Sequence, residues 1–207
     1  MTLSVSYASG SSDKPLLGST IGKFFDYAAG RYAEREAVVS IHQQVRFTYS
    51  QLAERVNKLA KAFISAGFQK GDRIGIWSPN NVQWLITQYA TAKAGLILVT
   101  INPAYRSHEL AYVLRQSGCK GLVLQNKFRS SNYEQMLCEL CPELPNVSTG
   151  KLLSIEYEQL TTIISTTESS VSGIYSWAEF NDLSNDLLDM SFLKQVAAES
   201  QYISPKS

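Results

Sequence analysis

The stretch KGDRIGIWSPNNVQWLITQYATAKAG, residues 70–95, runs from an apolar strand through a Ser-Pro-Asn-Asn turn into a helix. Such turns often bind nucleotide phosphates, because the N–H groups at a helix N-terminus attract anions. A phosphate-binding turn needs glycines for close approach, and often a lysine. The turn Ser78–Asn81 has neither, and Pro79 removes one N–H donor. We therefore predict that this turn only starts a helix, with Ser78 as a candidate cap.

A second stretch rich in hydroxyl groups, ISTTESSVSG, covers residues 164–173. Hydroxyl groups can contact phosphate, but the only glycine, Gly173, stands at the end and no lysine follows it directly. This stretch is predicted to be a solvated surface loop. The glycines of KGDRIG precede and interrupt a strand instead of opening a helix, which weakens the alternative of a nicotinamide-binding domain.

The two histidines give no catalytic site. His42 lies in a predicted hairpin link and His108 in the first turn of a predicted helix, where surface roles are common. Glu109 follows His108 directly, and adjacent helix residues do not face each other, so the two do not form an acid–base pair. The chain has no G-x-S-x-G, H-E-x-x-H or kinase signature. We assign no catalytic, cofactor-binding or metal-binding residue.

The three cysteines, Cys119, Cys138 and Cys141, are an odd number, which favours a reducing compartment over a disulfide framework. Cys138 and Cys141 form C-x-x-C within NYEQMLCELCPEL, a run with helical character that ends at Pro142. No second pair and no nearby histidine completes a metal site. Both are predicted to pack as small apolar residues on a helix face.

Composition excludes several classes of function. The chain has 207 residues, 44% of them hydrophobic and 18% charged, with a net charge of +1. This balance gives no field that would attract nucleic acid or anionic lipid. No apolar run approaches the roughly 18 residues of a membrane span. Residues 1–17 are rich in serine and lack arginine and an apolar block, so we predict a flexible tail and no clear transit or signal peptide.

Local patterns predict the first elements. A helix over residues 21–34 begins after Thr20, and a hairpin joins strands 37–41 and 45–49. One apolar face of that helix is predicted from four residues: Ile21, Phe24, Phe25 and Ala28. The clearest helix follows, because Thr48 and Gln51 form a capping box and Gly67 ends the apolar periodicity. Its core positions are Leu52, Val56, Leu59 and Phe63.

Strands and helices then alternate. Strands are predicted over residues 73–77, 96–101 and 121–124, and LILVTI at 96–101 has the continuous apolar character of a strand buried on both faces. One helix ends at Gly95, and another is capped by Ser107 and closed by Gly118. The fold class is therefore α/β, with a mainly parallel sheet flanked by helices.

Patterning weakens after Asn146. One strand-like run covers residues 160–164, and short helices are predicted in SWAEFNDL (176–183) and DLLDMSFLKQVAAE (186–199). No internal repeat is present. This last third is predicted to be connecting structure rather than a separate domain.

The ordered series of KGDRI, PN, AKAG, INPAYRSHEL and SGCKGLV closely resembles the N-terminal portion of adenylate-forming enzymes, the acyl-CoA synthetase superfamily. The resemblance covers residues 18–144 well and the remainder more loosely, and the medium-chain acyl-CoA synthetases are the most similar members. It implies a fold that is an incomplete N-terminal half of the large domain of these enzymes.

The resemblance also implies chemistry. Complete members join a fatty acid to ATP with Mg²⁺ as acyl-adenylate and pyrophosphate, and then transfer the acyl group to CoA. Their phosphate loop, Tyr-Gly-x-Thr-Glu adenylate motif, ribose-binding aspartate and C-terminal lysine have no counterpart here, because Thr167-Glu168 lacks the preceding Tyr-Gly. In the family the phosphate loop begins shortly after the position of SQYISPKS. We therefore expect a fragment that binds no ATP, Mg²⁺ or CoA and is inactive alone.

These considerations give residues 1–17 as a tail and 18–207 as a partial AMP-dependent synthetase domain, less regular over 146–207. Fatty acid and CoA are the expected substrates of the complete enzyme, and nucleic acid is not an expected partner. The resemblance implies a mitochondrial location, and the cytoplasm is the alternative. Apolar faces prepared for a missing half predict self-association or pairing with a complementary chain. The alternative is a non-catalytic short protein that binds a full-length synthetase or another partner through an exposed apolar face.

Overall fold

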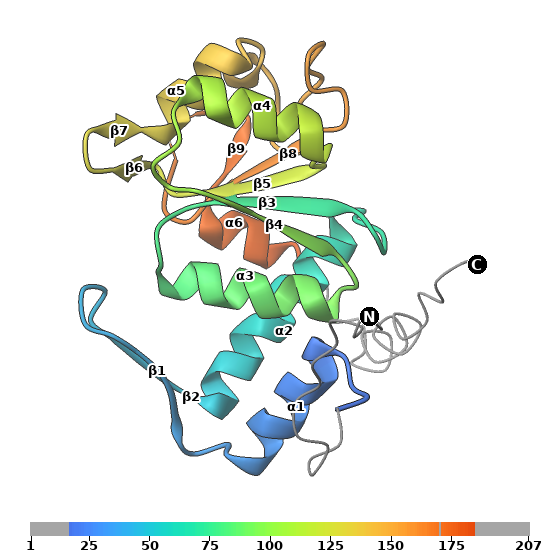
Figure 1. The fold of residues 1–207 in the computed structure, drawn as a ribbon, viewed down its shortest axis with the longest axis vertical. Coiled ribbons are helices and arrows are strands. Elements are labelled where there is room, and N and C mark those ends of the chain that lie inside the picture. Colours follow the sequence, from blue (N-terminus) through green and yellow to red (C-terminus); the bar gives the residue numbers. More distant parts are fainter. Residues whose placement is uncertain (1–16, 170, 185–207) are drawn as a thin grey trace, which may run out of the picture.

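The computed structural model describes residues 17–169 and 171–184 (Figure 1). Its centre is a five-stranded sheet in the order β4-β3-β5-β8-β9, and every neighbouring pair is parallel. The sheet strands are β3 (Arg73–Trp77), β4 (Ile97–Ile101), β5 (Gly121–Leu124), β8 (Thr162–Ser165) and β9 (Ile174–Tyr175). The predicted α/β class with a parallel sheet is confirmed.

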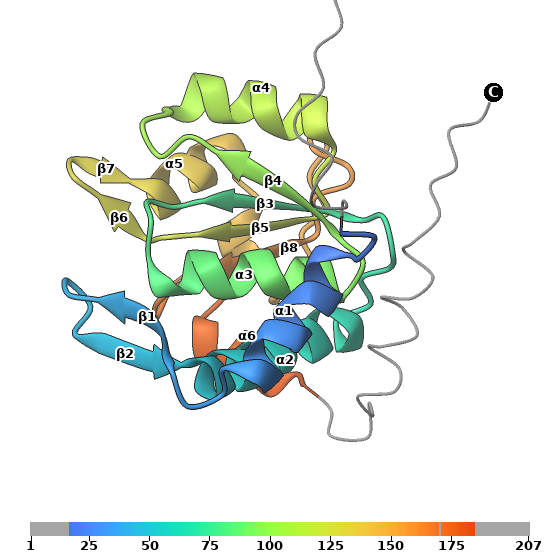
Figure 2. The ribbon, with the colours of Figure 1, turned by 60° about the horizontal axis from the view of Figure 1, so that its bottom comes forward.

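Helices cover both faces of this sheet (Figures 1 and 2). One face carries α1 (Ile21–Arg31), α2 (Tyr49–Ser65), α3 (Val82–Lys93) and α6 (Trp177–Asp182). The other carries α4 (Ser107–Ser117), α5 (Tyr133–Leu140) and a short 3-10 turn (Leu144–Asn146). Two antiparallel hairpins complete the fold: β1 (Glu36–Ser40) with β2 (Val45–Thr48), and β6 (Lys127–Phe128) with β7 (Ser131–Asn132).

Alternation along the strands divides the core into two clusters. Ile74 and Ile76 of β3 face α1, α2 and α3, whereas Trp77 faces α4 and α5. In β5, Val123 joins the first cluster and its neighbours join the second, as the two-residue period of a strand requires. Gly75 lies between Ile74 and Ile76 in β3, and a Cβ at this position would approach the Leu122 side chain to 2.9 Å.

The strongest prediction, α2, is confirmed. Gln51 N–H donates to Thr48 Oγ1 (3.2 Å) and Thr48 N–H donates to Gln51 Oε1 (3.0 Å), which is the predicted capping box. The predicted core positions are all buried: Leu52, Val56, Leu59 and Phe63. Gly67, with φ +84°, ends the helix in the left-handed region.

The prediction for residues 96–101 was wrong in its burial. β4 is the edge strand beside β3, and Ile97 is 50% exposed. An apolar run shows that the side chains of a strand can be buried. It does not show whether the strand has a neighbouring strand on one side or on both, because the strand order of the sheet decides that. Gly95 (φ +72°) and Gly118 (φ +58°) end α3 and α4 as predicted.

Two predicted caps were displaced. α3 begins at Val82 and its cap is Asn81, whose Oδ1 accepts from Trp84 N–H (2.7 Å), so Ser78 is not the cap. α4 begins at Ser107 itself, and the preceding Arg106 donates its N–H to Glu109 Oε2 (3.0 Å). Several polar residues compete near each helix start, and the local backbone geometry selects among them.

The apolar face predicted for the first helix is only partly buried. Phe25 is 4% exposed, but Ile21 is 61% and Phe24 47% exposed, and the helix ends at Arg31 rather than at residue 34. Gly22 and Ala29 are buried instead, and Gly22 lies directly against α3. A Cβ at Gly22 would meet Lys93 Cγ at 3.2 Å.

The last third contributes more than connections. β8 is buried and extends the sheet from β5, with Leu122 opposite Ile163, and α6 packs against α2. The loop 148–159 is irregular, as predicted. The helix predicted over 186–199 lies outside the described residues, as does the tail predicted over 1–17 apart from Leu17. Within the described part of the chain, no helix is long and apolar enough to cross a membrane.

Candidate functional site at the carboxyl edge of the sheet

The strand order places a topological switch point between β3 and β5. β3 comes first in the sheet, the chain then adds β4 on one side of it, and β5 follows on the other side. In open parallel sheets, ligands bind outside the carboxyl ends of the strands at such a point. Here β3 ends before Ser78 and β5 ends before Gln125, so the turn that opened the sequence analysis lies at this position.

Asn81 joins the two strand ends. Its Nδ2 donates to Ser78 Oγ (2.9 Å) and to Gln125 Oε1 (3.1 Å), and its Oδ1 accepts from Trp84 N–H. Gln125 in turn donates to the carbonyl of Lys127 (2.9 Å). One amide therefore caps α3 and bridges the switch point at the same time.

Gln43, in the link between β1 and β2, extends this network although it lies about forty residues away along the chain. Gln43 Oε1 accepts from Val82 N–H, the first amide of α3, at 2.8 Å, and Gln43 Nε2 donates to Gln83 Oε1 at 2.8 Å. Two of the N–H groups that an anion would need at this helix start are thus already bonded to side chains of the protein.

Amide and hydroxyl groups make up the whole network, so it positions backbone and offers no general base or nucleophile. Beside it, Trp77 stacks on Tyr133 with ring centroids 3.8 Å apart. The Tyr133 hydroxyl donates to the carbonyl of Pro103. Burial raises the pKa of Tyr133 to about 12, with Arg106 acting weakly against it, so this phenol stays protonated at neutral pH.

The two histidines lie on opposite sides of the sheet. His42 lies in the β1–β2 link, on the α2 side of the sheet, and its Nδ1 is 3.4 Å from Ser40 Oγ. His108 lies on α4, on the opposite side (Figure 1). Backbone N–H groups of Glu109 and Arg106 lower the pKa of Glu109, as expected of a carboxylate at a helix start.

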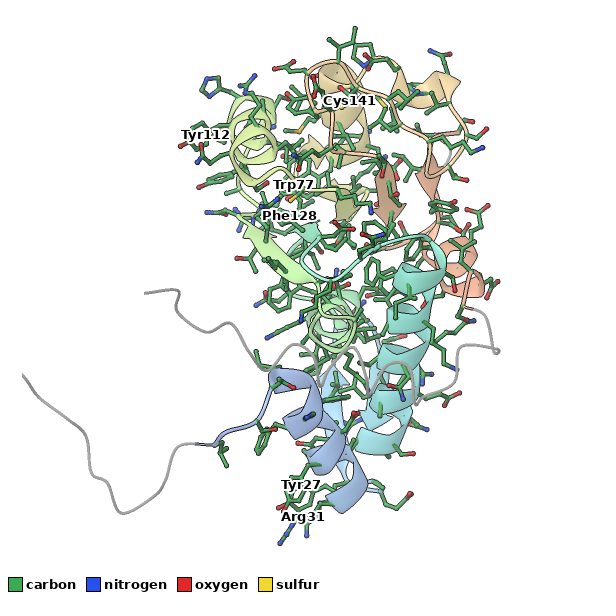
Figure 3. The ribbon with its side chains drawn as sticks, turned by 90° about the vertical axis from the view of Figure 1, so that its right-hand side faces the viewer. Tyr27, Arg31, Trp77, Tyr112, Phe128 and Cys141 are labelled. Carbon is green, nitrogen blue, oxygen red and sulfur yellow. The ribbon has the colours of Figure 1, made fainter. Side chains whose placement is uncertain are left out.

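The C-x-x-C residues belong to the core around α5. Cys141 is buried and Cys138 half-buried, and Cys141 lies one residue beyond the end of the helix (Figure 3). Burial raises the pKa of Cys141 to about 12, and that of Cys138 is raised as well. A thiol with a raised pKa is a poor nucleophile and a poor metal ligand. The three cysteines are free thiols.

The hydroxyl-rich loop was only partly predicted. Thr167 and Glu168 are exposed, as expected of a surface loop, whereas Ser165 and Thr166 are buried at the end of β8. Gly173 has a packing role, since a Cβ there would meet the Leu144 carbonyl at 2.3 Å. Thr167 also accepts from Trp177 N–H through its carbonyl (3.2 Å), which ties the loop to α6.

These residues do not fit a nucleotide triphosphate with Mg²⁺. The start of α3 is bonded internally, no glycine lies in its turn, and the residues 17–169 and 171–184 contain no cluster of three His, Cys, Asp or Glu side chains that could hold a metal. No step of catalysis is therefore assigned to this edge.

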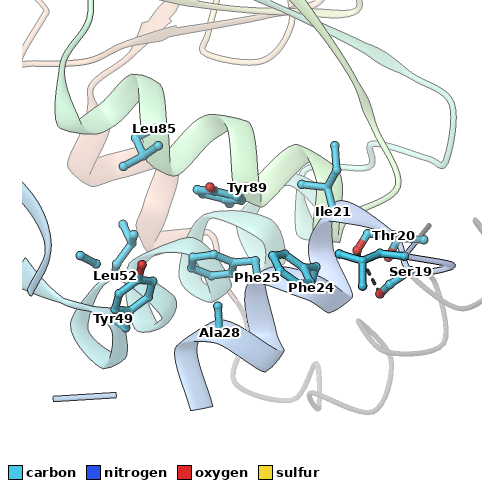
Figure 4. Close-up of a pocket in the computed structure, with 12 residues that line it drawn as sticks. Ser19, Thr20, Ile21, Phe24, Phe25, Ala28, Tyr49, Leu52, Leu85 and Tyr89 are labelled. Atoms are coloured by element: carbon cyan, nitrogen blue, oxygen red, sulfur yellow. Dashed lines mark hydrogen bonds between the residues drawn. The ribbon is translucent and has the colours of Figure 1, made fainter. Parts of the chain in front are cut away.

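Away from the edge, a pocket of about 470 Å³ lies among α1, α2 and α3 (Figure 4). It is mainly apolar. A smaller one, of about 320 Å³, lies between β2, α2, α3 and α6, where Arg55 stacks over Phe47 and Lys58 pairs with Asp182 at 2.8 Å.

The fold is that of a known family, and residues 25–187 match the AMP-binding enzyme family. The chain belongs to this family.

Within this family, the chain is similar to medium-chain acyl-CoA ligases. The mitochondrial medium-chain acyl-CoA ligase ACSF2 of Mus musculus is 45% identical over 161 residues, which are 78% of this chain and 26% of the relative. The protein of the same name from Danio rerio is 41% identical over 165 residues, 80% of this chain and 27% of the relative. The chain thus spans about a quarter of the length of these relatives.

Solved structures give the same fold. A long-chain-fatty-acid-CoA ligase from Archaeoglobus fulgidus matches with a TM-score of 0.66 at 22% identity, over 87% of this chain and 33% of that one. The R395G form of coronafacic acid ligase from Pectobacterium brasiliense matches with a TM-score of 0.65 at 20% identity, over 81% and 30%. The resemblance found in the sequence is confirmed.

The Gln43–Asn81–Gln125 network was missed by sequence reasoning. Its three amides stand about forty residues apart and carry no motif. The one local signal was Asn81 three residues before Trp84, a spacing that fits an N-cap.

Proposed function

We propose that the chain is the N-terminal part of an acyl-CoA synthetase. In complete form this enzyme would activate a medium-chain fatty acid with ATP as acyl-adenylate and transfer the acyl group to CoA. The observation that carries the proposal is the 45% identity with ACSF2 over 161 residues, together with a match that spans only 26% of that relative.

In this proposal the described residues support the fold and leave the chemistry to residues beyond them. The carboxyl edge of the sheet carries amides that bond to one another, with no acid–base group and no free helix start. The chain alone is therefore expected to show no ATP–pyrophosphate exchange with octanoate, Mg²⁺ and ATP.

The native product tests the proposal first. An antibody raised against residues 151–207 is used on extracts of cells that express the gene. A band much larger than the calculated 23.0 kDa is expected. That product is then purified and assayed for octanoate-dependent exchange, with acetate and palmitate as comparison acids. A large product without exchange for any acid would overturn the proposed activity.

A non-catalytic short protein is the second candidate, and the exposed apolar residues of α1 favour it. A band at 23 kDa that co-purifies with a full-length synthetase would support this candidate over the first. Mitochondrial location is proposed from the names of the ACSF2 relatives, and cell fractionation with the same antibody tests it.

A further inference from the structure

The pocket between β2, α2, α3 and α6, which we call the α6 pocket, combines an apolar lining with positive charge. Val82 and Ile86 of α3, each 4% exposed, belong to the lining. Phe47 of β2 and Trp177 of α6 add two half-buried aromatic rings. Its volume of about 320 Å³ lies within the range of small-molecule sites. The α6 pocket can therefore enclose the apolar body of a small ligand.

The described lining residues leave one net positive charge at the α6 pocket. Three of them are ionisable: Arg55 and Lys58 of α2, and Asp182 at the end of α6. Lys58 Nζ donates to Asp182 Oδ1 at 2.8 Å, so this pair largely cancels its own charge. Among residues 17–169 and 171–184, the charge of Arg55 has no ion-pair partner. A ligand of opposite charge would supply one.

The Arg55 guanidinium group is held in one orientation before any ligand arrives. Its central carbon lies 3.9 Å from the centre of the Phe47 ring, and Nη1 donates to the Gln51 carbonyl at 3.0 Å. A guanidinium group has five N–H donors, and this bond uses one of them. The other donors match the two oxygens of a carboxylate. Because the side chain is already fixed, less conformational entropy is lost when a carboxylate binds.

These features together define the ligand. The charge of Arg55 selects a monoanion, and the rings of Phe47 and Trp177 favour an aromatic body over a polar one. We propose that the α6 pocket binds a small aromatic carboxylate, with the carboxylate on Arg55 and the ring against the apolar lining. The proposal involves no reaction step, so it stands independently of the synthetase activity.

Titration of the full chain with benzoate tests the proposal. The indole N–H signal of Trp177, assigned in NMR spectra with the Trp177→Phe variant, is expected to shift with a Kd of about 1 mM. The indole signal of Trp77, which is fully buried among the α4-side residues, is expected to stay in place. Benzamide has nearly the same shape without the charge, so it should bind about tenfold more weakly.

Two variants separate the roles of charge and shape. Arg55→Gln should weaken benzoate binding about tenfold and leave benzamide binding unchanged. Lys151→Gln, the same loss of charge at an exposed position of the irregular loop, is the matched control and should change neither. Ala178→Phe places a ring at an exposed lining position and keeps every charge, so it should abolish the benzoate shift. This variant decides the matter if Arg55→Gln also perturbs the fold by losing the stacking on Phe47.

Three results would overturn the proposal. The first is no Trp177 shift at benzoate concentrations tenfold above the expected Kd. The second is equal affinity for benzoate and benzamide, or benzoate binding that both Arg55→Gln and Ala178→Phe leave intact. The third is a set of shifts confined to α1 and Tyr89, which would assign benzoate to the larger pocket among α1, α2 and α3.

Discussion

α1 and α2 have the same kind of amphipathic pattern, but they bury different fractions of their apolar faces. Both are amphipathic, and both begin after a threonine whose hydroxyl accepts a backbone N–H. Every predicted apolar position of α2 is buried against α1, α3, α6 and the sheet, whereas half of the predicted face of α1 is exposed. In Figure 3, Tyr27 and Arg31 lie at the C-terminal end of α1, far from Trp77 in the core. An apolar pattern states what a helix can bury, and its neighbours decide what it does bury.

The largest expected effect comes from Leu59→Ala in α2. Leu59 has no exposed surface, so the change leaves a cavity and should lower the free energy of unfolding by about 3 kcal/mol. Phe24→Ala, the matched change on α1, should cost about 1 kcal/mol or less, because the ring is half-exposed. Urea unfolding of both variants measures the contrast, and equal losses would show that α1 is as well packed as α2.

Lys93→Met is expected to come next. The side chain of Lys93 is 3% exposed, and its ammonium group lies 2.5 Å from Asp26 of α1 and 2.5 Å from Asn57 of α2. Removing it should cost about 2 kcal/mol, since Asn57 loses a charge-assisted bond while Asp26, 40% exposed, can still be hydrated. Hydrogen exchange should speed more in α1 than in α2. A uniform change across both helices would argue against Lys93 as the main attachment of α1.

The two caps give a smaller contrast. Thr48→Ala breaks a reciprocal capping box and should destabilise the chain by about 1 kcal/mol. Thr20→Ala removes a single 3.3 Å bond at a helix end that already lies at the surface, so about half that loss is expected. Thermal unfolding with Thr→Ser controls at both positions measures the difference, and a larger loss at Thr20 would contradict it.

The last effect concerns the other side of the sheet and is visible only in alkali. In the folded chain the pKa of Tyr133 is about 12, against about 10 in an unfolded chain, so folding favours the protonated phenol. This stabilisation is complete below pH 10 and is lost as the pH rises from 10 toward 12. Unfolding at pH 8 and pH 11 should therefore show a smaller alkaline loss for Tyr133→Phe than for the unchanged chain. The same slope for both would assign the loss to other groups.

Only the turn at Ser78–Asn81 of the candidate site could be predicted from the sequence. The residue types of Ser78–Asn81 already excluded a phosphate loop, because glycine and lysine are absent. The bonds from Gln43 and Gln125 that close the start of α3 could not be predicted, since those residues come from a distant hairpin and a neighbouring strand. The family could be recognised because its motifs are local and ordered along the chain.

The sequence by itself determined the elements whose signals lie within a few residues. α2 with its capping box, strands β3 and β5, and the left-handed glycines after α3 and α4 all follow from side-chain periodicity and backbone sterics. The tertiary structure alone decided that β4 lies at an edge and that half of the apolar face of α1 is exposed. Strand order and helix packing join residues far apart in the chain, and burial depends on those neighbours rather than on the residue itself.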